Sequence, residues 1–416
     1  MIQYEKHILD NGLTVITHKD CSTPLVTVNI LYKVGARNED PTLTGFAHLF
    51  EHLMFGGSPN FPDYDFVVNG LGGESNAFTS NDYTNYYLTV PAEGLEQALQ
   101  LEADRMRTLA FSEDTLRLQQ SVVTEEYHQR YMNQPYGDVW LLLRPLCYRV
   151  HPYRWCTIGS SIKHVQQASL EDVRQFFNRF YHPSNAIMAI AGNLDHEDAL
   201  RMVRAAFGDI PDRVTPACPI PNEPVQNASR SLRVKRDVPA SALYKAYPMC
   251  DRFNHDYYVY DLISDILSNG NSSRLYNKLV KQERLFSELN AYITGDLDAG
   301  LFVVSGKLCD GVDMRIAESA VDRELQAIAT EPVPEAELQK VVNKYESTFV
   351  FSQYKNADRA LSLCYYDMIG HIDWVNIEPE NYRSVTPADI QRVARATFDP
   401  RHCSTLYYEA ENSSQS

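Results

Sequence analysis

The first half of the chain shows strand-like and helix-like patterns of apolar residues in turn. The dipeptide Asn11-Gly12 is typical of a tight hairpin turn, and the runs rich in β-branched and aromatic residues that follow it are typical of strands. Longer segments with apolar residues at helical spacing separate or follow these runs. The predicted strands are residues 13–17, 26–32, 75–80, 84–90 and 186–192, and the predicted helices are residues 92–108, 112–133 and 197–207.

A proline-rich stretch divides the chain into two parts of similar length. Prolines at this density stiffen and extend a chain, which is typical of a linker. The prolines are Pro211, Pro216, Pro219, Pro221 and Pro224. After them the order of the first half repeats, with strands near 231–247, helices near 256–284, strands near 288–307 and helices near 312–330 and 334–352.

This repeat predicts the fold class. A chain of 416 residues is too long for one ordinary core. We therefore predict an α+β fold of two similar domains, each a mostly antiparallel sheet with helices packed on one face. The expected limits are residues 1–210 and 229–416, with a linker at 211–228.

Composition excludes several classes of function. The formal net charge of −16 disfavours nucleic acid as a partner and favours solubility. No apolar run approaches the ~20 residues of a membrane-spanning helix. No signal peptide is visible at the N-terminus, which favours the cytoplasm, or the periplasm if a leader has been removed. The eight cysteines form no C-x-x-C pair, so a cysteine-based zinc site is not expected.

The segment His48-Leu49-Phe50-Glu51-His52 carries the clearest chemical signal. Residues four positions apart on a helix project from the same face, so both imidazoles can bind one Zn²⁺. Glu51 can reach the same side and take a proton from a metal-bound water, as in the inverted zincin motif H-x-x-E-H. A solvated helix face is the plainer interpretation of such a cluster. The apolar surroundings argue against it, because burying unpaired ionisable groups is costly.

A catalytic zinc site needs a third protein ligand as well as an open position. The predicted helix at 112–133 offers Glu125, Glu126 and His128 as candidates. Spacing alone does not choose among these side chains, because each also suits a solvated helix face. The third ligand therefore stays open on this argument.

Other short segments, spread over nearly the whole chain, are informative together with this motif. They are Gly45-x-Ala47-His48-Leu49-x-Glu51-His52-Leu53-Met54-Phe55-x-Gly57, Gly73-x-x-Asn76-Ala77-x-Thr79, His151-Pro152-Tyr153 with Ile158-Gly159, Tyr181-x-Pro183-x-Asn185-Ala186, and Ser272-Ser273-Arg274-Leu275-Tyr276. Together they resemble the pitrilysin-type zinc peptidases, which include insulin-degrading enzyme and the mitochondrial processing peptidase. The chain length resembles one half of pitrilysin, as in the processing-peptidase-like branch.

The resemblance implies specific roles. The family pattern E-R-x-V-V-x-x-E falls on residues 119–126, which implies that Glu126 is the third ligand and Glu125 its exposed neighbour. Glu126 follows His52 by 126 − 52 = 74 positions, close to the family's usual separation. The implied activity is a zinc-dependent endopeptidase with one Zn²⁺ per chain and Glu51 as the base. A strand comprising Asn76, Ala77, Phe78 and Thr79 would bind peptide as an added strand, which predicts broad specificity.

Two departures from the family pattern qualify this expectation. Gln119 stands where the family has a carboxylate near the metal site, so reduced metal affinity or activity is expected. The family's Arg and Tyr that support the substrate carbonyl align with Val280 and Ser287, and neither suits that role. We therefore expect the chain to work beside a partner subunit whose second half supplies the pair. The expected assembly is a homodimer or a heterodimer with a related subunit, and only the heterodimer meets this need.

Other functions compete with hydrolysis. The main alternative is a non-catalytic assembly subunit of such a heterodimer, and a weaker one is a peptide-binding chamber without turnover. The complete set of His48, Glu51, His52 and Glu126 favours the enzyme.

Overall fold

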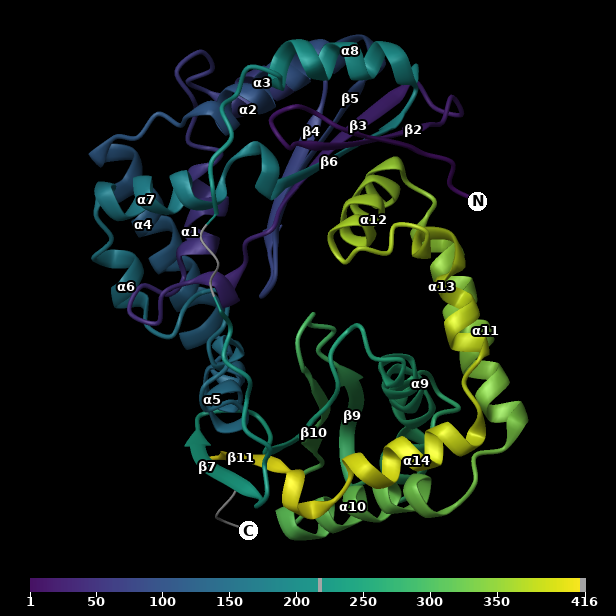
Figure 1. The fold of residues 1–416 in the computed structure, drawn as a ribbon. Coiled ribbons are helices and arrows are strands. Elements are labelled where there is room, and N and C mark those ends of the chain that lie inside the picture. The colour runs from purple at the N-terminus through teal and green to yellow at the C-terminus, as the bar shows by residue number, and fades with distance from the viewer. Residues whose placement is uncertain (216–218, 412–416) are drawn as a thin grey trace. The chain divides into compact units, whose positions relative to one another are not determined.

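The chain folds into two compact units, each built from separate stretches of sequence. The computed structural model describes residues 1–215 and 219–411 (Figure 1). Unit 1 comprises Met1–His128, Trp155–Pro221 and Phe349–Ile377, and unit 2 comprises Gln129–Arg154, Asn222–Thr348 and Glu378–Ser416. The change of unit after Pro221 falls inside the predicted linker, of which residues 216–218 lie outside the described part of the chain. In that described part, no helix combines the length and the apolar character needed to cross a lipid bilayer.

Unit 1 is organised around a six-stranded sheet with the order β1-β2-β6-β3-β5-β4. All neighbouring strands are antiparallel except β2 and β6, which are parallel. The strand β4 therefore lies at one edge, paired with β5 alone among the described strands. The strands are β1 (Glu5–Ile8), β2 (Thr14–Lys19), β3 (Leu25–Tyr32), β4 (Glu74–Thr79), β5 (Thr84–Pro91) and β6 (Ala186–Gly192).

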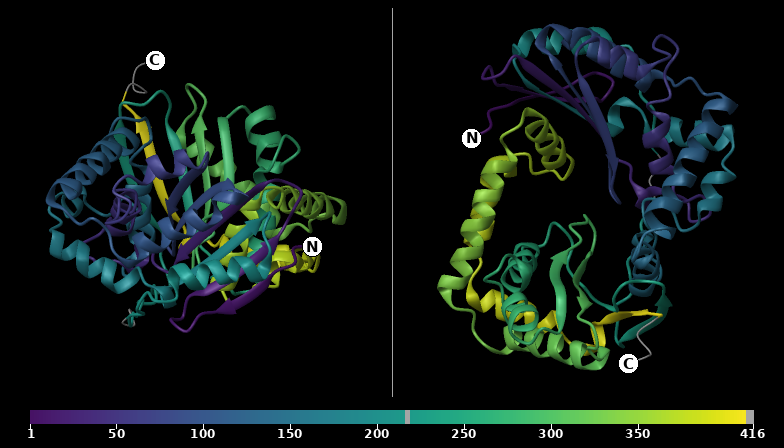
Figure 2. Two further views of the ribbon diagram at one scale, coloured as in Figure 1. Left: turned by 90° about the horizontal axis from the view of Figure 1, so that it is seen from above. Right: turned by 180° about the vertical axis from the view of Figure 1, so that it is seen from behind.

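Helices cover both faces of this sheet. Successive residues of a strand point to opposite faces, and two neighbours on β2 meet helices on different sides. Thr17 lies 2.7 Å from the ring of His196, on α8, whereas the His18 ring contacts Arg359, on α12. Figures 1 and 2 show α12 across the sheet from α3 and α8. The helices of unit 1 are α1 (Phe46–Leu53), α2 (Tyr64–Gly70), α3 (Leu95–Arg107), α4 (Glu113–Tyr127), α6 (Ile162–Gln166), α7 (Leu170–Phe180), α8 (His196–Phe207) and α12 (Asn356–Met368).

Unit 2 repeats this plan with a five-stranded sheet ordered β7-β11-β8-β10-β9. The late strand β11 is parallel to β7 and antiparallel to β8, just as β6 is parallel to β2 and antiparallel to β3. The strands are β7 (Arg230–Arg236), β8 (Ala242–Pro248), β9 (Phe286–Ile293), β10 (Leu301–Leu308) and β11 (Ser404–Ala410). The helices are α5 (Val139–Cys147), α9 (Asp256–Ser268), α10 (Met314–Thr330) and α14 (Pro387–Thr397), with the π-helical turn η6 (Tyr276–Gln282); α11 (Glu335–Ser352) and α13 (Trp374–Arg383) lie partly in each unit.

Alternate residues of β10 reach two separate apolar clusters in unit 2. Phe302 and Val304 belong to the cluster formed with α9, α10 and α14. Leu301 and Val303 belong to the cluster that contains Val139 and Leu143 of α5. Each sheet thus has one face covered by a helix from the other half of the chain, α12 for unit 1 and α5 for unit 2.

The predicted fold class is confirmed: the chain has two similar α+β units with mostly antiparallel sheets. The structure adds the exchanged helices on the second faces, which the prediction of helices on one face did not include. The segment 256–284, predicted as helical, is interrupted, because α9 ends at Ser268 and Gly270 takes a left-handed conformation with φ +87°. The division into domains at 1–210 and 229–416, with a linker at 211–228, stays a prediction.

Candidate metal centre

The helix α1 carries the motif and is fixed at both its start and its apolar face. It begins after Gly45, whose φ of +88° is the left-handed conformation that glycine adopts readily. The carboxylate of Glu39 accepts hydrogen bonds from the N–H groups of Gly45 at 2.9 Å and Ala47 at 2.8 Å. On the buried side the Phe50 ring stacks on Tyr181, with centroids 5.1 Å apart. The orientation of the histidine-bearing face is therefore set by the core.

Two histidines of α1 and one glutamate of α4 converge. One ligand atom from each of His48, His52 and Glu126 lies within 4.8 Å of the others. Glu126 Oε2 is 3.5 Å from His48 Nε2 and 3.3 Å from His52 Nε2. The three side chains are 11%, 23% and 17% exposed, so the group opens to solvent on one side. No other group of this kind occurs among residues 1–215 and 219–411.

The helix α4 presents Glu126 toward α1 and its neighbour outward. Gln120 anchors the helix by donating from Nε2 to the carbonyls of Val165 and Ala168, both at 2.9 Å. Glu125 and His128, the other candidates from spacing, are exposed. Gln119 precedes Glu126 by two helical turns and is half-buried on the same face of α4.

Glu51 has a defined partner on the neighbouring strand. The hydroxyl of Thr79, at the end of β4, donates to Glu51 Oε2 at 2.6 Å. The buried hydroxyls of Tyr86 and Tyr181 lie nearby and contact each other at 3.0 Å. Burial raises the pKa of both phenols, and the negative charge of Glu51 raises these pKa values further.

The predicted substrate strand coincides with the edge strand β4. Asn76 is exposed, and its Oδ1 accepts a hydrogen bond from the backbone N–H of Ala77 at 2.8 Å. Phe78 is half-buried and packs edge-on against Tyr83, with ring centroids 5.8 Å apart. An edge strand has one side on which another extended chain can pair.

Glu39 is a residue of the site that was not predicted from the sequence. Burial raises the pKa of this carboxyl to about 8, and the N–H donors of Ala47 and Gly45 oppose that rise. An acidic residue shortly before a helix N-terminus is a known favourable placement. Glu39 has this placement, but residues 40–44 separate it from α1, so the sequence does not show which helix its carboxylate caps.

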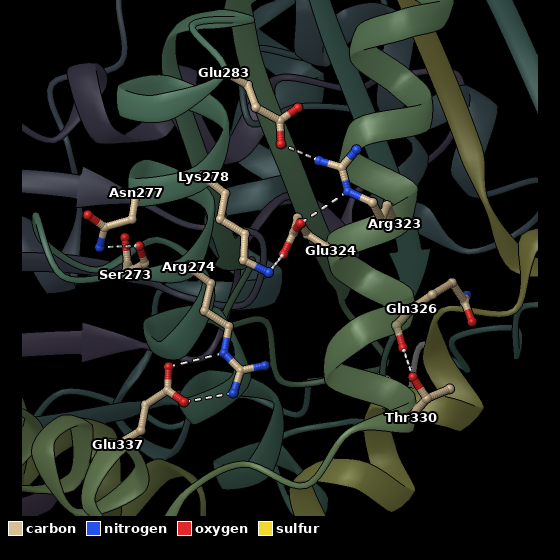
Figure 3. A network of polar contacts seen from close by, with 10 residues as sticks. All are labelled: Ser273, Arg274, Asn277, Lys278, Glu283, Arg323, Glu324, Gln326, Thr330 and Glu337. Carbon is tan, nitrogen blue, oxygen red and sulfur yellow. Dashed lines mark hydrogen bonds and ion pairs between the residues drawn. The ribbon is translucent and has the colours of Figure 1, made fainter.

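The two positions that align with the family's Arg and Tyr lie in unit 2. Val280 belongs to η6 and packs partly buried against the unit 2 core. The exposed Ser287, on β9, donates to the carbonyl of Lys307 at 3.2 Å. An ion pair between Lys278 and Glu324, 2.6 Å long, fastens η6 to α10 (Figure 3). This turn is therefore well anchored. It carries valine, not arginine, at position 280.

Comparison with known proteins gives a consistent result. A family model described as Insulinase (Peptidase family M16) matches residues 14–139, and one described as Peptidase M16 inactive domain matches residues 167–345. The zinc protease PqqE of Helicobacter pylori is 28% identical over 415 residues, covering 97% of this chain and 92% of that protein. An uncharacterized zinc protease of Streptomyces coelicolor is 26% identical over 416 residues, covering 94% and 87%.

Solved structures share the fold over the full length. A protease from Helicobacter pylori is 27% identical with a TM-score of 0.92, over 98% of this chain and all (100%) of that one. A putative M16-like peptidase from Alicyclobacillus acidocaldarius is 17% identical with a TM-score of 0.85, over 99% of each chain, and shows the fold alone. The span of the inactive-domain model includes none of His48, Glu51, His52 and Glu126.

Proposed function

Because this chain belongs to the M16 (insulinase) family of peptidases, we propose that it is a zinc-dependent endopeptidase acting on peptides or unfolded segments. The observation that carries the proposal is the convergence of His48, His52 and Glu126. All three lie within the span of the family model that is not described as inactive.

The geometry of the three side chains fits a zinc ion. Two ligand atoms that each lie about 2.0–2.1 Å from one tetrahedral Zn²⁺ are about 3.3–3.4 Å apart. The distances from Glu126 Oε2 to the two histidine nitrogens, 3.5 and 3.3 Å, match this spacing. A bound zinc ion would lower the pKa of water in its open position and polarise the scissile carbonyl.

Glu51 supplies the proton chemistry in this proposal. Its carboxylate lies one residue before His52 on α1 and accepts from Thr79. It would take the proton of the attacking water and then deliver it to the nitrogen of the leaving amine. Proton transfer of this kind contributes roughly 10²–10⁴-fold to rates, so the effect of losing it is large.

The strand β4 would bind the peptide backbone. It is an edge strand that ends at Thr79, beside the carboxylate of Glu51. A peptide paired with Asn76, Ala77 and Phe78 would be held mainly by main-chain hydrogen bonds, with side chains read only in alternate positions. Broad specificity follows from such recognition.

A partner subunit is part of the proposal. The positions that align with the family's Arg and Tyr are Val280, which has no side-chain donor, and Ser287, whose hydroxyl donates to the carbonyl of Lys307. A related subunit with Arg and Tyr at these positions would supply the pair, whereas a second copy of this chain would again bring Val280 and Ser287. If the purified chain alone cleaves peptides as fast as after addition of a related subunit, this requirement is wrong.

The second candidate function is a non-catalytic subunit. Gln119 and Val280 favour it, because each replaces a charged residue that the family pattern places near the reaction. In that case the chain would bind zinc and peptide without turnover.

Metal analysis and three variants test the proposal. We expect about one zinc per chain, cleavage that EDTA abolishes and zinc restores, and loss of zinc binding in Glu126→Gln but not in its exposed neighbour Glu125→Gln. Glu51→Gln should keep its zinc and lose about 10²-fold or more of kcat. Zinc binding without hydrolysis of any peptide, with or without a related subunit, would instead establish the non-catalytic function.

A further inference from the structure

We propose that Thr79 is a positioning residue, which holds the Glu51 carboxylate in its working orientation and links that orientation to the edge strand β4. The inference rests on the proposed role of Glu51 as the base. It differs from the substrate contact predicted for Thr79, because the hydroxyl acts through Glu51 and not on the peptide.

The hydroxyl of Thr79 has one proton and two acceptors within reach. Glu51 Oε2 lies at 2.6 Å, whereas the carbonyl oxygen of Ala47 lies at 3.4 Å. The shorter contact has the length of a charge-assisted O–H···O⁻ bond, which is about twice as strong as a bond between neutral groups. The proton is therefore donated to the carboxylate of Glu51.

The position of this contact on α1 matters. Ala47 and Glu51 are four residues apart, so Thr79 meets one face of α1, next to the face formed by His48 and His52. A glutamate side chain has three rotatable bonds, and a base must lie within hydrogen-bond reach of the proton that it takes. Donation to Oε2 restricts the orientation of the carboxylate.

The same contact joins the base to the place where a peptide would pair. Thr79 is the last residue of β4 and lies opposite Thr84 in the register with β5. A peptide that adds to the open side of β4 would restrain the backbone of this strand, and hence the position of the Thr79 hydroxyl. Peptides long enough to pair along β4 should therefore gain in kcat as well as in binding.

Substitutions at position 79 separate this role from packing and from substrate contact. Thr79→Val keeps the shape and removes the hydroxyl, whereas Thr79→Ser keeps the hydroxyl. We expect Thr79→Val to lower kcat about 10- to 100-fold with little change in KM and in zinc content, and Thr79→Ser to restore most of the loss. The gain in kcat with peptide length should also disappear in Thr79→Val.

Thr89→Val is the matched control. It removes a threonine hydroxyl from β5, where Thr89 bonds to Thr27 at 2.8 Å, and we expect it to leave kcat unchanged. An unchanged kcat in Thr79→Val would overturn the proposal. A rise in KM at constant kcat would overturn it too, because that result assigns the hydroxyl to the substrate.

Crystal structures of the zinc-loaded variants keep the test independent of turnover. If the wild-type protein hydrolyses no peptide, the proposed function fails, but the position of Glu51 still decides the role of Thr79. A Glu51 carboxylate that is displaced or spread over several rotamers in Thr79→Val, and ordered in Thr79→Ser, supports positioning. A carboxylate that stays in place in Thr79→Val overturns it.

Discussion

A single buried carboxylate, Glu39, fixes where the histidine-bearing helix begins. Its two oxygens accept from the N–H groups of Gly45 and Ala47, which have no partner within the helix at its first turn. Burial opposes the charge on this group and raises the pKa of Glu39 to about 8. The same side chain therefore anchors α1 and makes the stability of unit 1 dependent on pH.

The sign of that dependence follows from proton linkage. The pKa of Glu39 is about 8 in the folded chain, against 4.5 for an ordinary glutamate. The folded state therefore holds the proton more tightly, and the contribution of Glu39 to stability is complete below pH 4.5 and falls as the pH rises toward 8. We expect the free energy of unfolding of the metal-free protein to drop by at least about 1 kcal/mol from this group over that range.

Urea unfolding at several pH values, compared with Glu39→Gln, isolates this contribution. The variant should lose the pH-dependent part. It should also be less stable than the wild type at pH 5, because the amide NH₂ would face one of the two backbone donors. Parallel pH profiles for the two proteins would contradict the assignment to Glu39.

Some residues of the site could be predicted from the sequence alone, and others could not. The spacing of His48 and His52 is enough to place both imidazoles on one helical face, because the period of a helix is local information. Glu126 lies 126 − 52 = 74 residues beyond His52, so choosing it over Glu125 needed the family resemblance. Glu39 could not be assigned, because its role depends on how a loop returns to a helix.

At the scale of elements, the conformation of Gly45 controls the entry into α1. Its φ is +88°, and an added Cβ would lie 2.7 Å from the carbonyl oxygen of Ile158. We expect Gly45→Ala to cost about 2 kcal/mol or more and to weaken zinc binding, because backbone strain and a clash both displace the start of the helix. Thermal unfolding and zinc titration measure the two effects.

Gly72→Ala provides the control for strain without a clash. Gly72 has φ +68°, but an added Cβ there would meet nothing within 4 Å. That variant should cost only about 1 kcal/mol and leave zinc affinity unchanged. Equal losses in both variants would show that the contact with Ile158 is unimportant.

Strands were more predictable than the ends of helices. The runs at 26–32, 84–90 and 186–192 became β3, β5 and β6, because apolar alternation and β-branched residues report directly on a half-buried or buried sheet. The break after α9 was missed, because a lone glycine such as Gly270 is tolerated within helices and does not mark a helix end by itself. The strand β11 was also missed, although it is the unit 2 counterpart of β6.

At the scale of the molecule, the two halves of the chain exchange a helix. The first half contributes α5 to unit 2, and the second half contributes α12 to unit 1, where Cys364 donates from Sγ to the carbonyl of Ile187 at 3.4 Å. No local pattern predicts such an exchange, because an amphipathic helix does not specify which of two similar sheets it covers.

This exchange predicts how the chain behaves when it is cut. We expect a chain cleaved at a protease site engineered into residues 211–221 to stay together under native conditions, because each fragment holds a helix buried in the other fragment's core. Size-exclusion chromatography of the cleaved protein measures this, and urea provides the control in which the fragments separate. Separation without denaturant would contradict the exchange of helices.

The helix α12 also sets the order in which this protein can mature during synthesis. Every residue of the candidate metal centre has been translated by Glu126, and every strand of its sheet by Gly192, yet Asn356–Met368 must still emerge before the second face of that sheet is covered. Ribosomes add about 5–20 residues per second, so the apolar face stays exposed on the nascent chain for many seconds. The half with the candidate metal centre is thus the first to be made and among the last to be finished.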